Sequence, residues 1–376
     1  MARCRWDRWP AAAVGFSWLT WLGVAGCAGG GAYAVDPSSM ALADTAPTLD
    51  LQVDEEAHVI SVRMGPFTPT AGEHGAHVPD EDSTLSPLMR FEWPVDGWLR
   101  GFRVRLFDAE GKELPRDILH HVIGVNFGRR QLVHPALERF VGVGSETGDV
   151  VLPEELGVPM TRGQSLALYA SLHDETGGTP PVHVLVTMPY TPRDEHDDVT
   201  AVLPVYLDTN HHVGATNAWD LPPGRSERSW EFTVPVSGDL LGVSGHLHDH
   251  GRYVRLEDAE TDEVLVELEA RRDRQGHVEE VETRAFRKWL GLRWDPLRLE
   301  RGHPYRVVGV YDSPLQDIVP NGAMAHIVGI FAPDDMAQWP ALDMMNDTIR
   351  LDVAALPMEP GEQPTGGGDQ DGLHVH

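Results

Sequence analysis

The chain has 376 residues, which is long enough for two domains that each bury a hydrophobic core. Its formal net charge is −28, so it has no basic stripe that could neutralise a phosphate backbone, and we expect no nucleic-acid partner. It contains only two cysteines, Cys4 and Cys27.

Residues 1–26 have the features of a signal peptide. Arg3, Arg5 and Arg8 precede the apolar stretch "AAAVGFSWLTWLGVAG", which ends in small residues directly before Cys27. This arrangement resembles a bacterial lipoprotein signal, in which the cysteine becomes the lipidated first residue. We therefore expect an exported protein, anchored through Cys27 to a bacterial membrane and facing the periplasm or the outside of the cell. The alternatives are an ordinary secretory signal cut nearby, or a membrane anchor.

Two further segments are expected to lie outside the folded domains. Residues 27–50 are small, polar and turn-prone, as in a flexible tether, and residues 356–376 have the composition of a disordered tail. Cys4 leaves with the signal, so the mature domains have no disulfide and no thiolate to offer a metal. A transition-metal site would have to use histidine, methionine and carboxylate ligands.

The region between these segments predicts an all-β fold of two tandem β-sandwich, jelly-roll-like domains. Short alternating or apolar runs such as "GFRVRLFDAEGKEL" and "YRVVGVY" are separated by Gly, Pro, Asp and Asn. The charged break "MPYTPRDEHDDVT" at 188–200 divides the region into residues 51–192 and 200–355. Only "VETRAFRKWLGL", residues 281–292, suggests a short helix or an irregular excursion.

Strand-like segments hold a small part of the 19 histidines. Histidines at every second position of an extended chain project from one side, and two such imidazoles can chelate an ion. Taken singly, a histidine at a strand end is more often a hydrogen-bonded structural residue, and a methionine is more often core. His211 and His212 lie in a loop and are expected to be peripheral. The residues of interest are His120, His121, His173, His246, His248, His250 and Met324.

The order of these residues, HH then H then HxH then M, resembles the copper type II, ascorbate-dependent monooxygenases, the family of peptidylglycine α-hydroxylating and dopamine β-monooxygenases. The resemblance spans residues 85–335 and includes "ETGDVVLPEELGVPMTRGQSLALYASLH" before the third histidine. It implies two copper ions, one in each domain. By this resemblance the first ion is held by His120, His121 and His173, and the second by His246, His248 and Met324.

The resemblance also implies an activity: the hydroxylation of a C–H bond in a small substrate at the second site, with dioxygen and a reductant such as ascorbate. The soft thioether of Met324 favours Cu(I), and imidazoles suit copper in both oxidation states. The chain departs from the peptide-hydroxylating members at three positions, where Ser244, His326 and Val328 replace an arginine, an asparagine and a tyrosine. The clamp for a peptide carboxylate is therefore missing.

His250 and His326 are extra imidazoles, which we expect beside the second copper without binding it directly. Two other functions stay open from the sequence: a copper-binding or copper-buffering lipoprotein without turnover, and a structural or carbohydrate-associated β-sandwich protein. Two geometric expectations test the metal sites. The strand must bend at His120 and His121 for both to face one ion. The segments "SGHLHDH" and "AMAHIVGIF" must be neighbouring strands.

Overall fold

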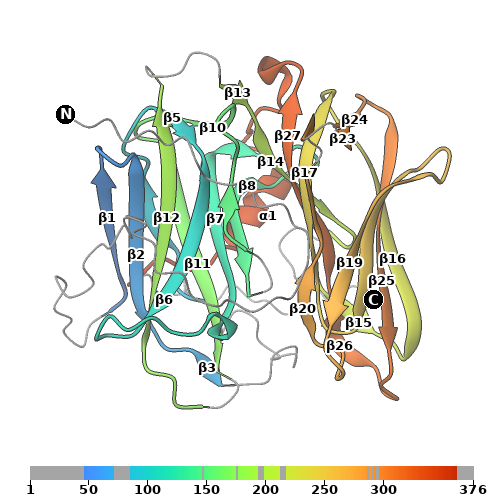
Figure 1. Cartoon of the computed structure of the whole chain (residues 1–376), viewed down its shortest axis with the longest axis horizontal. Coiled ribbons are helices and arrows are strands. Elements are labelled where there is room, and N and C mark those ends of the chain that lie inside the picture. Colours follow the sequence, from blue (N-terminus) through green and yellow to red (C-terminus); the bar gives the residue numbers. More distant parts are fainter. Residues whose placement is uncertain are drawn as a thin grey trace. The chain divides into compact units, whose positions relative to one another are not determined.

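Strands make up almost all of the regular structure of this protein, a computed structural model, which confirms the all-β expectation (Figure 1). The structure describes residues 46–71, 85–145, 148–174, 177–193, 199–211, 217–285, 288–289, 292–293 and 296–361. All of these residues belong to one compact unit. The expected signal peptide, Cys27 and most of the expected tether and tail lie outside the described residues.

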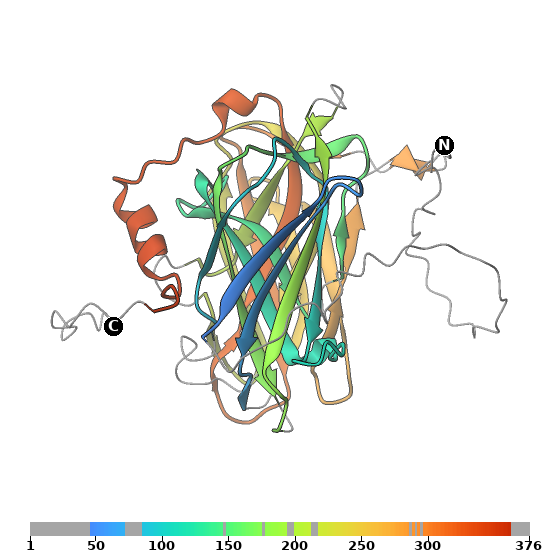
Figure 2. The same cartoon turned by 90° about the vertical axis from the view of Figure 1, so that its left-hand side faces the viewer.

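The first half of the chain forms two sheets that face each other. One has the order β1-β2-β12-β5-β10-β13, with β6 paired to β12 and to β9, and β1 lies at its edge (Figure 2). The other has the order β3-β11-β7-β8, with β4 paired to β11. The strands are β1 (Thr48–Asp54), β2 (Val59–Phe67), β3 (Thr70–Ala71), β4 (Met89–Glu92), β5 (Gly97–Leu99), β6 (Gly101–Phe107), β7 (Leu119–Arg130), β8 (Leu137–Gly144), β9 (Val150–Val151), β10 (Leu156–Met160), β11 (Ser165–Asp174), β12 (Val182–Pro192) and β13 (Thr200–Ala201).

The chain enters the second half after β13. One sheet has the order β14-β27-β17-β21, with β24 paired to β17, and the other has the order β16-β25-β18-β19-β20. Two small ribbons, β15-β26 and β22-β23, complete it. The strands are β14 (Leu203–Asp208), β15 (Trp219–Leu221), β16 (Gly224–Thr233), β17 (Gly238–Leu247), β18 (Gly251–Asp258), β19 (Val264–Arg272), β20 (Val278–Val281), β21 (Thr283–Ala285), β22 (Lys288–Trp289), β23 (Leu292–Arg293), β24 (Leu297–Leu299), β25 (Pro304–Ser313), β26 (Val319–Ala323) and β27 (Ala325–Pro333).

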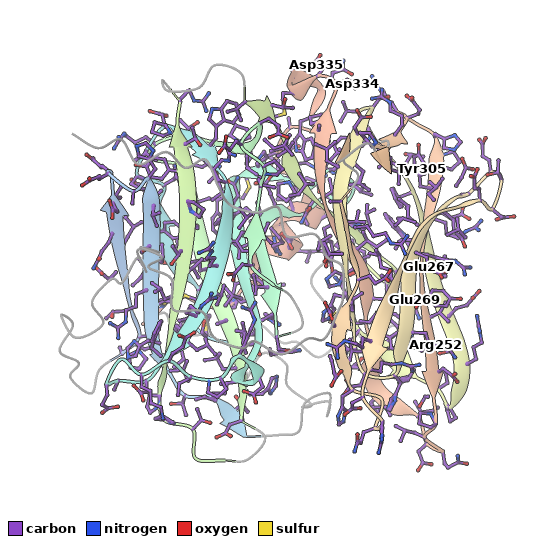
Figure 3. All side chains as sticks on the ribbon, viewed as in Figure 1. Arg252, Glu267, Glu269, Tyr305, Asp334 and Asp335 are labelled. Atoms are coloured by element: carbon purple, nitrogen blue, oxygen red, sulfur yellow. The ribbon has the colours of Figure 1, made fainter. Side chains whose placement is uncertain are left out.

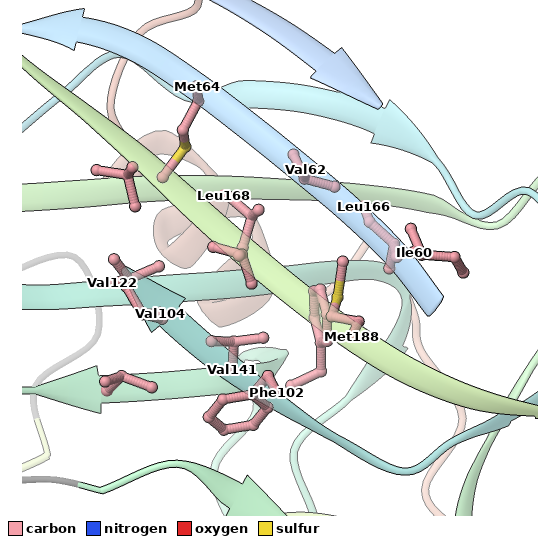
Figure 4. Packing of buried hydrophobic residues seen from close by; sticks show 14 of the residues in the cluster. Ile60, Val62, Met64, Phe102, Val104, Val122, Val141, Leu166, Leu168 and Met188 are labelled. Carbon is pink, nitrogen blue, oxygen red and sulfur yellow. The ribbon is translucent and has the colours of Figure 1, made fainter. Parts of the chain in front are cut away.

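Each half has its own hydrophobic core, built by the alternation of side chains along the strands. In the first half Ile60, Val62 and Met64 of β2 meet Leu166 and Leu168 of β11 from the facing sheet (Figure 4). The second core forms in the same way from residues such as Val205, Leu247, Val254, Leu268 and Ile327. Arg252 and Glu269 project into solvent from β18 and β19 (Figure 3).

Helical structure occurs where the sequence did not suggest it. The described residues of 281–292 form strand pieces, whereas the α-helix α1 spans Asp347–Ala354. The Asn346 side chain caps α1 by accepting hydrogen bonds from the backbone N–H groups of Thr348 and Ile349. Short 3₁₀ turns lie at Arg116–Ile118 and Met336–Gln338. No helix among the described residues is long and apolar enough to span a membrane.

Residues 334–361, here called the C-terminal strap, pass from β27 back onto the first half. The Asp352 carboxylate accepts hydrogen bonds from the Leu137 backbone N–H (2.8 Å) and from the Arg139 guanidinium (2.7 and 3.1 Å). Ile349 is 1% exposed, packed in a small cluster with Leu137. The second half is therefore fastened to the first by more than the short connection before β14.

Candidate metal centre

The strand β7 begins with a β-bulge at His120. In the pairing of β7 with β11, His121 lies opposite Ser171 and Leu119 lies opposite Leu172, so that His120 is the extra residue. Leu119 and Val122 both point into the core, and the two histidines between them both remain outside it. This is the bend that the sequence required for the adjacent pair.

The bulge brings three imidazoles of the first half together. The ring centre of His120 lies 4.7 Å from that of His121 and 4.7 Å from that of His173, which is near the end of β11. His120 Nδ1 lies 3.4 Å from Ser171 Oγ, a contact that orients its ring. The expected proximity of His173 to the pair is thus present in the structure.

The second half supplies its imidazoles from two neighbouring strands. In the antiparallel pairing of β17 with β27, His246 lies opposite His326 and Leu247 lies opposite Ala325. The His248 backbone N–H donates to the carbonyl of Met324 (3.2 Å), so Met324 is next to His248 across the pair. The two segments are side by side, as the sequence analysis expected.

Alternation along these strands decides which way the side chains face. Leu247, Ala325 and Ile327 enter the core of the second half, so His246 and His326 share the opposite face. His248 and Met324 extend the two strands by one residue each through their backbone hydrogen bond. The ring centres of His246 and His248 are 5.3 Å apart, and those of His246 and His326 are 4.7 Å apart with a 26° angle between the planes. The site is therefore on the outer face of its sheet.

The two groups of imidazoles meet. The ring centres of His120 and His248 are 6.4 Å apart. Burial, reinforced by the nearby His121 and His248, holds the pKa of His120 well below its usual value. Burial and the neighbouring His246 and His248 do the same to the pKa of His326. Both imidazoles are consequently neutral at physiological pH, the protonation state in which histidine binds metals.

The ring spacings fit shared metal ions. A metal-bound imidazole nitrogen lies about 2 Å from the ion, which puts its ring centre about 3.2 Å away, so two imidazoles at right angles or slightly wider have centres about 4.5–5.2 Å apart. The observed spacings of 4.7 Å lie within this range, and the 5.3 Å between His246 and His248 lies just above it. Over the described ranges, however, no group of three or more His, Cys, Asp or Glu side chains is arranged as it stands to hold a metal ion. Ring rotations would have to complete any such site.

One residue was missed in the sequence analysis although it borders the centre. Asp208, at the end of β14, lies opposite His326, and it is 0% exposed. Burial raises the pKa of this carboxyl to about 6, against the effect of the hydrogen bond from Tyr206. The signal was present in "VYLDTN", where a tyrosine and an aspartate at alternate positions interrupt an apolar strand.

His250 is not on the face expected for it. The strand β17 ends at Leu247, and His250 occupies a turn with φ +66°, where its pKa is lowered by burial and influenced by Asp249, Arg272 and His277. None of the clustered imidazoles is among those influences. The alternation that would align His250 with His246 and His248 requires a continuous strand, so it does not place His250 on their face, and its position beside the second copper stays a prediction.

A second pair of histidines lies beyond Asp208 and Tyr206 from the candidate metal centre. The ring centre of His134, in the turn between β7 and β8, is 3.7 Å from that of His211 and 4.7 Å from the ring of Trp230. His134 Nε2 accepts from the backbone N–H of Asp208 (3.4 Å), and His134 Nδ1 is buried with no hydrogen-bond partner in the described structure. Because His134 comes from the first half and the others from the second, the contact lies where the halves meet.

A pocket of about 550 Å³ lies elsewhere. It is lined by Arg129, Arg162, Arg193 and Gln164, among others. Arg129 and Gln164 belong to the far end of the β7–β11 pair from the histidines, because His120 begins β7 and His173 ends β11. The pocket is therefore separate from the candidate metal centre.

No protein-family model and no curated protein matches the sequence. Among solved structures, the chain is similar to the STIV major capsid protein (9% identity, TM-score 0.38, covering 79% of this chain and 99% of that one). It is also similar to the major capsid protein P2 from bacteriophage PM2 (10% identity, TM-score 0.34, covering 66% of this chain and 93% of that one). These likenesses are too distant to carry an argument about function.

Proposed function

We propose that this protein is an exported, lipid-anchored copper protein that hydroxylates a C–H bond of a small substrate with dioxygen and a reductant such as ascorbate. The observation that supports it best is the convergence of ligand types drawn from both halves of the chain. The adjacent pair, the single histidine and the HxH strand come together, and Met324 is next to His248.

The donor sets determine what each site would hold. His120, His121 and His173 offer three imidazoles, which accept copper in either oxidation state. His246, His248 and Met324 combine imidazoles with a thioether, which favours Cu(I). When bound, copper would supply one-electron redox chemistry and dioxygen activation. The chain's own contribution is to orient the ligands, as Ser171 does for His120.

The surroundings of the second donor set bear on the substrate. Two residues along the strands from the His246–His326 pair, and on the same face, Ser244 lies opposite Val328. The Ser244 hydroxyl accepts from the Thr283 hydroxyl (3.1 Å). Neither Ser244 nor Val328 carries a charge that could bind a substrate carboxylate. We therefore propose a substrate that is not held by an anionic group at this position.

Copper loading followed by oxygen consumption tests the proposal. The purified mature protein should bind two copper ions and show ascorbate-dependent oxygen use that increases with a neutral small substrate. Two bound ions without substrate-linked oxygen use would favour the copper-buffering alternative. A protein that binds no copper would contradict both copper functions and leave the structural or carbohydrate-associated alternative.

Met324 provides a sharper test of the second site. Met324→Ala should weaken binding of Cu(I) selectively, because it removes the soft ligand and leaves the imidazoles. His246→Ala should weaken the binding of both Cu(I) and Cu(II). Competition with Cu(I)- and Cu(II)-specific chelators measures the two affinities. Equal losses for both oxidation states in Met324→Ala would contradict the assignment of the thioether.

A further inference from the structure

His326 is placed as a ligand would be. It lies directly opposite His246 on the adjacent strand, and residues opposite one another in an antiparallel pair project from the same face with Cβ atoms about 5 Å apart. Its ring centre is 4.7 Å from that of His246, within the range that two imidazoles on one ion require. His248 lies beside this pair, because its ring centre is 5.3 Å from that of His246 and it is among the groups that lower the pKa of His326.

The hydrogen bonds around Tyr206 determine which nitrogen of His326 is free to bind a metal. The Tyr206 hydroxyl donates its one proton to Asp208 Oδ2, and its oxygen accepts from Asn217 Nδ2 (3.1 Å). His326 Nδ1 lies 3.5 Å from the same oxygen. Because that oxygen has no second proton to give, it can only accept from His326 Nδ1–H. The proton then resides on Nδ1, and Nε2 keeps its lone pair.

Further hydrogen bonds hold the Asp208 carboxylate in place at the end of this chain of contacts. Its Oδ2 also accepts from Asn217 Nδ2 (3.0 Å), and its Oδ1 accepts from the backbone N–H of Asn210 (2.7 Å). Every donor that reaches this carboxylate is neutral in the described structure, although the carboxyl is 0% exposed. A buried anion without a cation is unfavourable, and a metal ion nearby would compensate it.

We propose that His326 Nε2 is a third imidazole ligand of the ion held by His246 and His248, and that Tyr206 and Asp208 are positioning residues that fix its ring. The inference rests on the proposed copper function and differs from the sequence-based expectation that His326 stays outside the ligand set. Carboxylate-linked hydrogen bonds to the far nitrogen of a ligating histidine hold its ring and its tautomer. Here the link passes through a tyrosine hydroxyl.

The test compares His326→Ala with a control histidine in the copper-loaded mature protein. His326→Ala should weaken Cu(II) binding at the second site by more than about 100-fold, beyond the loss typical of an outer partner. The electron paramagnetic resonance spectrum of that site should lose the splitting from one coupled nitrogen. His250→Ala removes an imidazole three residues from Leu247 in the turn and should change neither quantity.

Tyr206→Phe separates positioning from folding. It keeps the ring and removes the hydroxyl, so we expect an affinity loss of about 10–100-fold and an altered nitrogen splitting, with near-ultraviolet circular dichroism unchanged. If the wild type binds two copper ions while His326→Ala and Tyr206→Phe both keep its affinity and spectrum, the inference is overturned and the proposed function stands. If the wild type binds no copper, the proposed function fails and the inference fails with it.

Discussion

His134 should make the protein sensitive to acid. Its ring is 1% exposed, between Trp230 of β16 and His211, and its Nε2 accepts a backbone hydrogen bond. Burial, with the nearby His211 and Arg130, lowers the pKa of His134 to about 2. The folded protein therefore keeps this imidazole neutral at pH 4.5 and above.

The magnitude follows from the difference between the folded and unfolded chain. An unfolded histidine titrates near 6.5, so below that pH the unfolded state binds a proton that folded His134 does not. Well below pH 6.5 each pH unit lowers the free energy of unfolding by about 1.4 kcal/mol, and the total loss between pH 7.5 and 4.5 is about 2.7 kcal/mol. The contribution is fully present above pH 6.5 and is lost as the pH falls.

The assay is urea unfolding of the wild type and of His134→Gln at pH 7.5 and 4.5. Glutamine stays neutral and can still accept from the backbone N–H, so its packing cost is the same at both values of pH. Between pH 7.5 and 4.5, the free energy of unfolding of the variant should fall by about 2–3 kcal/mol less than that of the wild type. Equal losses would refute the reasoning, because folded His134 would then have to accept the proton.

Three other predictions concern the strap, the second core and the anchor. Asp352→Ala should lower the free energy of unfolding by about 3–5 kcal/mol, because Arg139 loses its buried carboxylate; a urea midpoint close to the wild type's would contradict this. Gly309→Ala should cost about 1–3 kcal/mol, since the added Cβ would lie 2.4 Å from that of Ala325, and Ala325→Gly in the same chain should restore stability. Cys27→Ser should abolish lipid labelling and membrane retention, and unchanged acylation would disprove the anchor.

The fold class was predictable because strand alternation is a local property. Val243 and Leu247 already predict a buried face for β17, and His246 and His248 the opposite one. The helix α1 was not predictable in the same way. It has only eight residues, and its stability comes from Ile349 and Asp352 packing against β8, a partner more than 200 positions earlier in the chain.

For the candidate site, too, the features that follow from local strand geometry were predictable and those that depend on long-range strand pairing were not. The need for a bend at His120 and His121 followed from strand geometry alone, and the bulge is there. The alignment of His250 with His246 and His248 was expected by extending β17 past Leu247, where the chain instead turns. The roles of Tyr206 and Asp208 depend on the pairing of β14 with β27, which joins residues about 120 positions apart. Sequence periodicity contains no information about such pairing.

The C-terminal strap has a consequence for any attempt to divide this protein. A chain cut after β27 would leave Leu137 and Val125 without the Ile349 side chain that covers them. The two sandwiches are thus not independent modules that can be exchanged between proteins or prepared singly for copper titration. A usable first half would need residues 334–361 rejoined to it by a linker, as in a circular permutation.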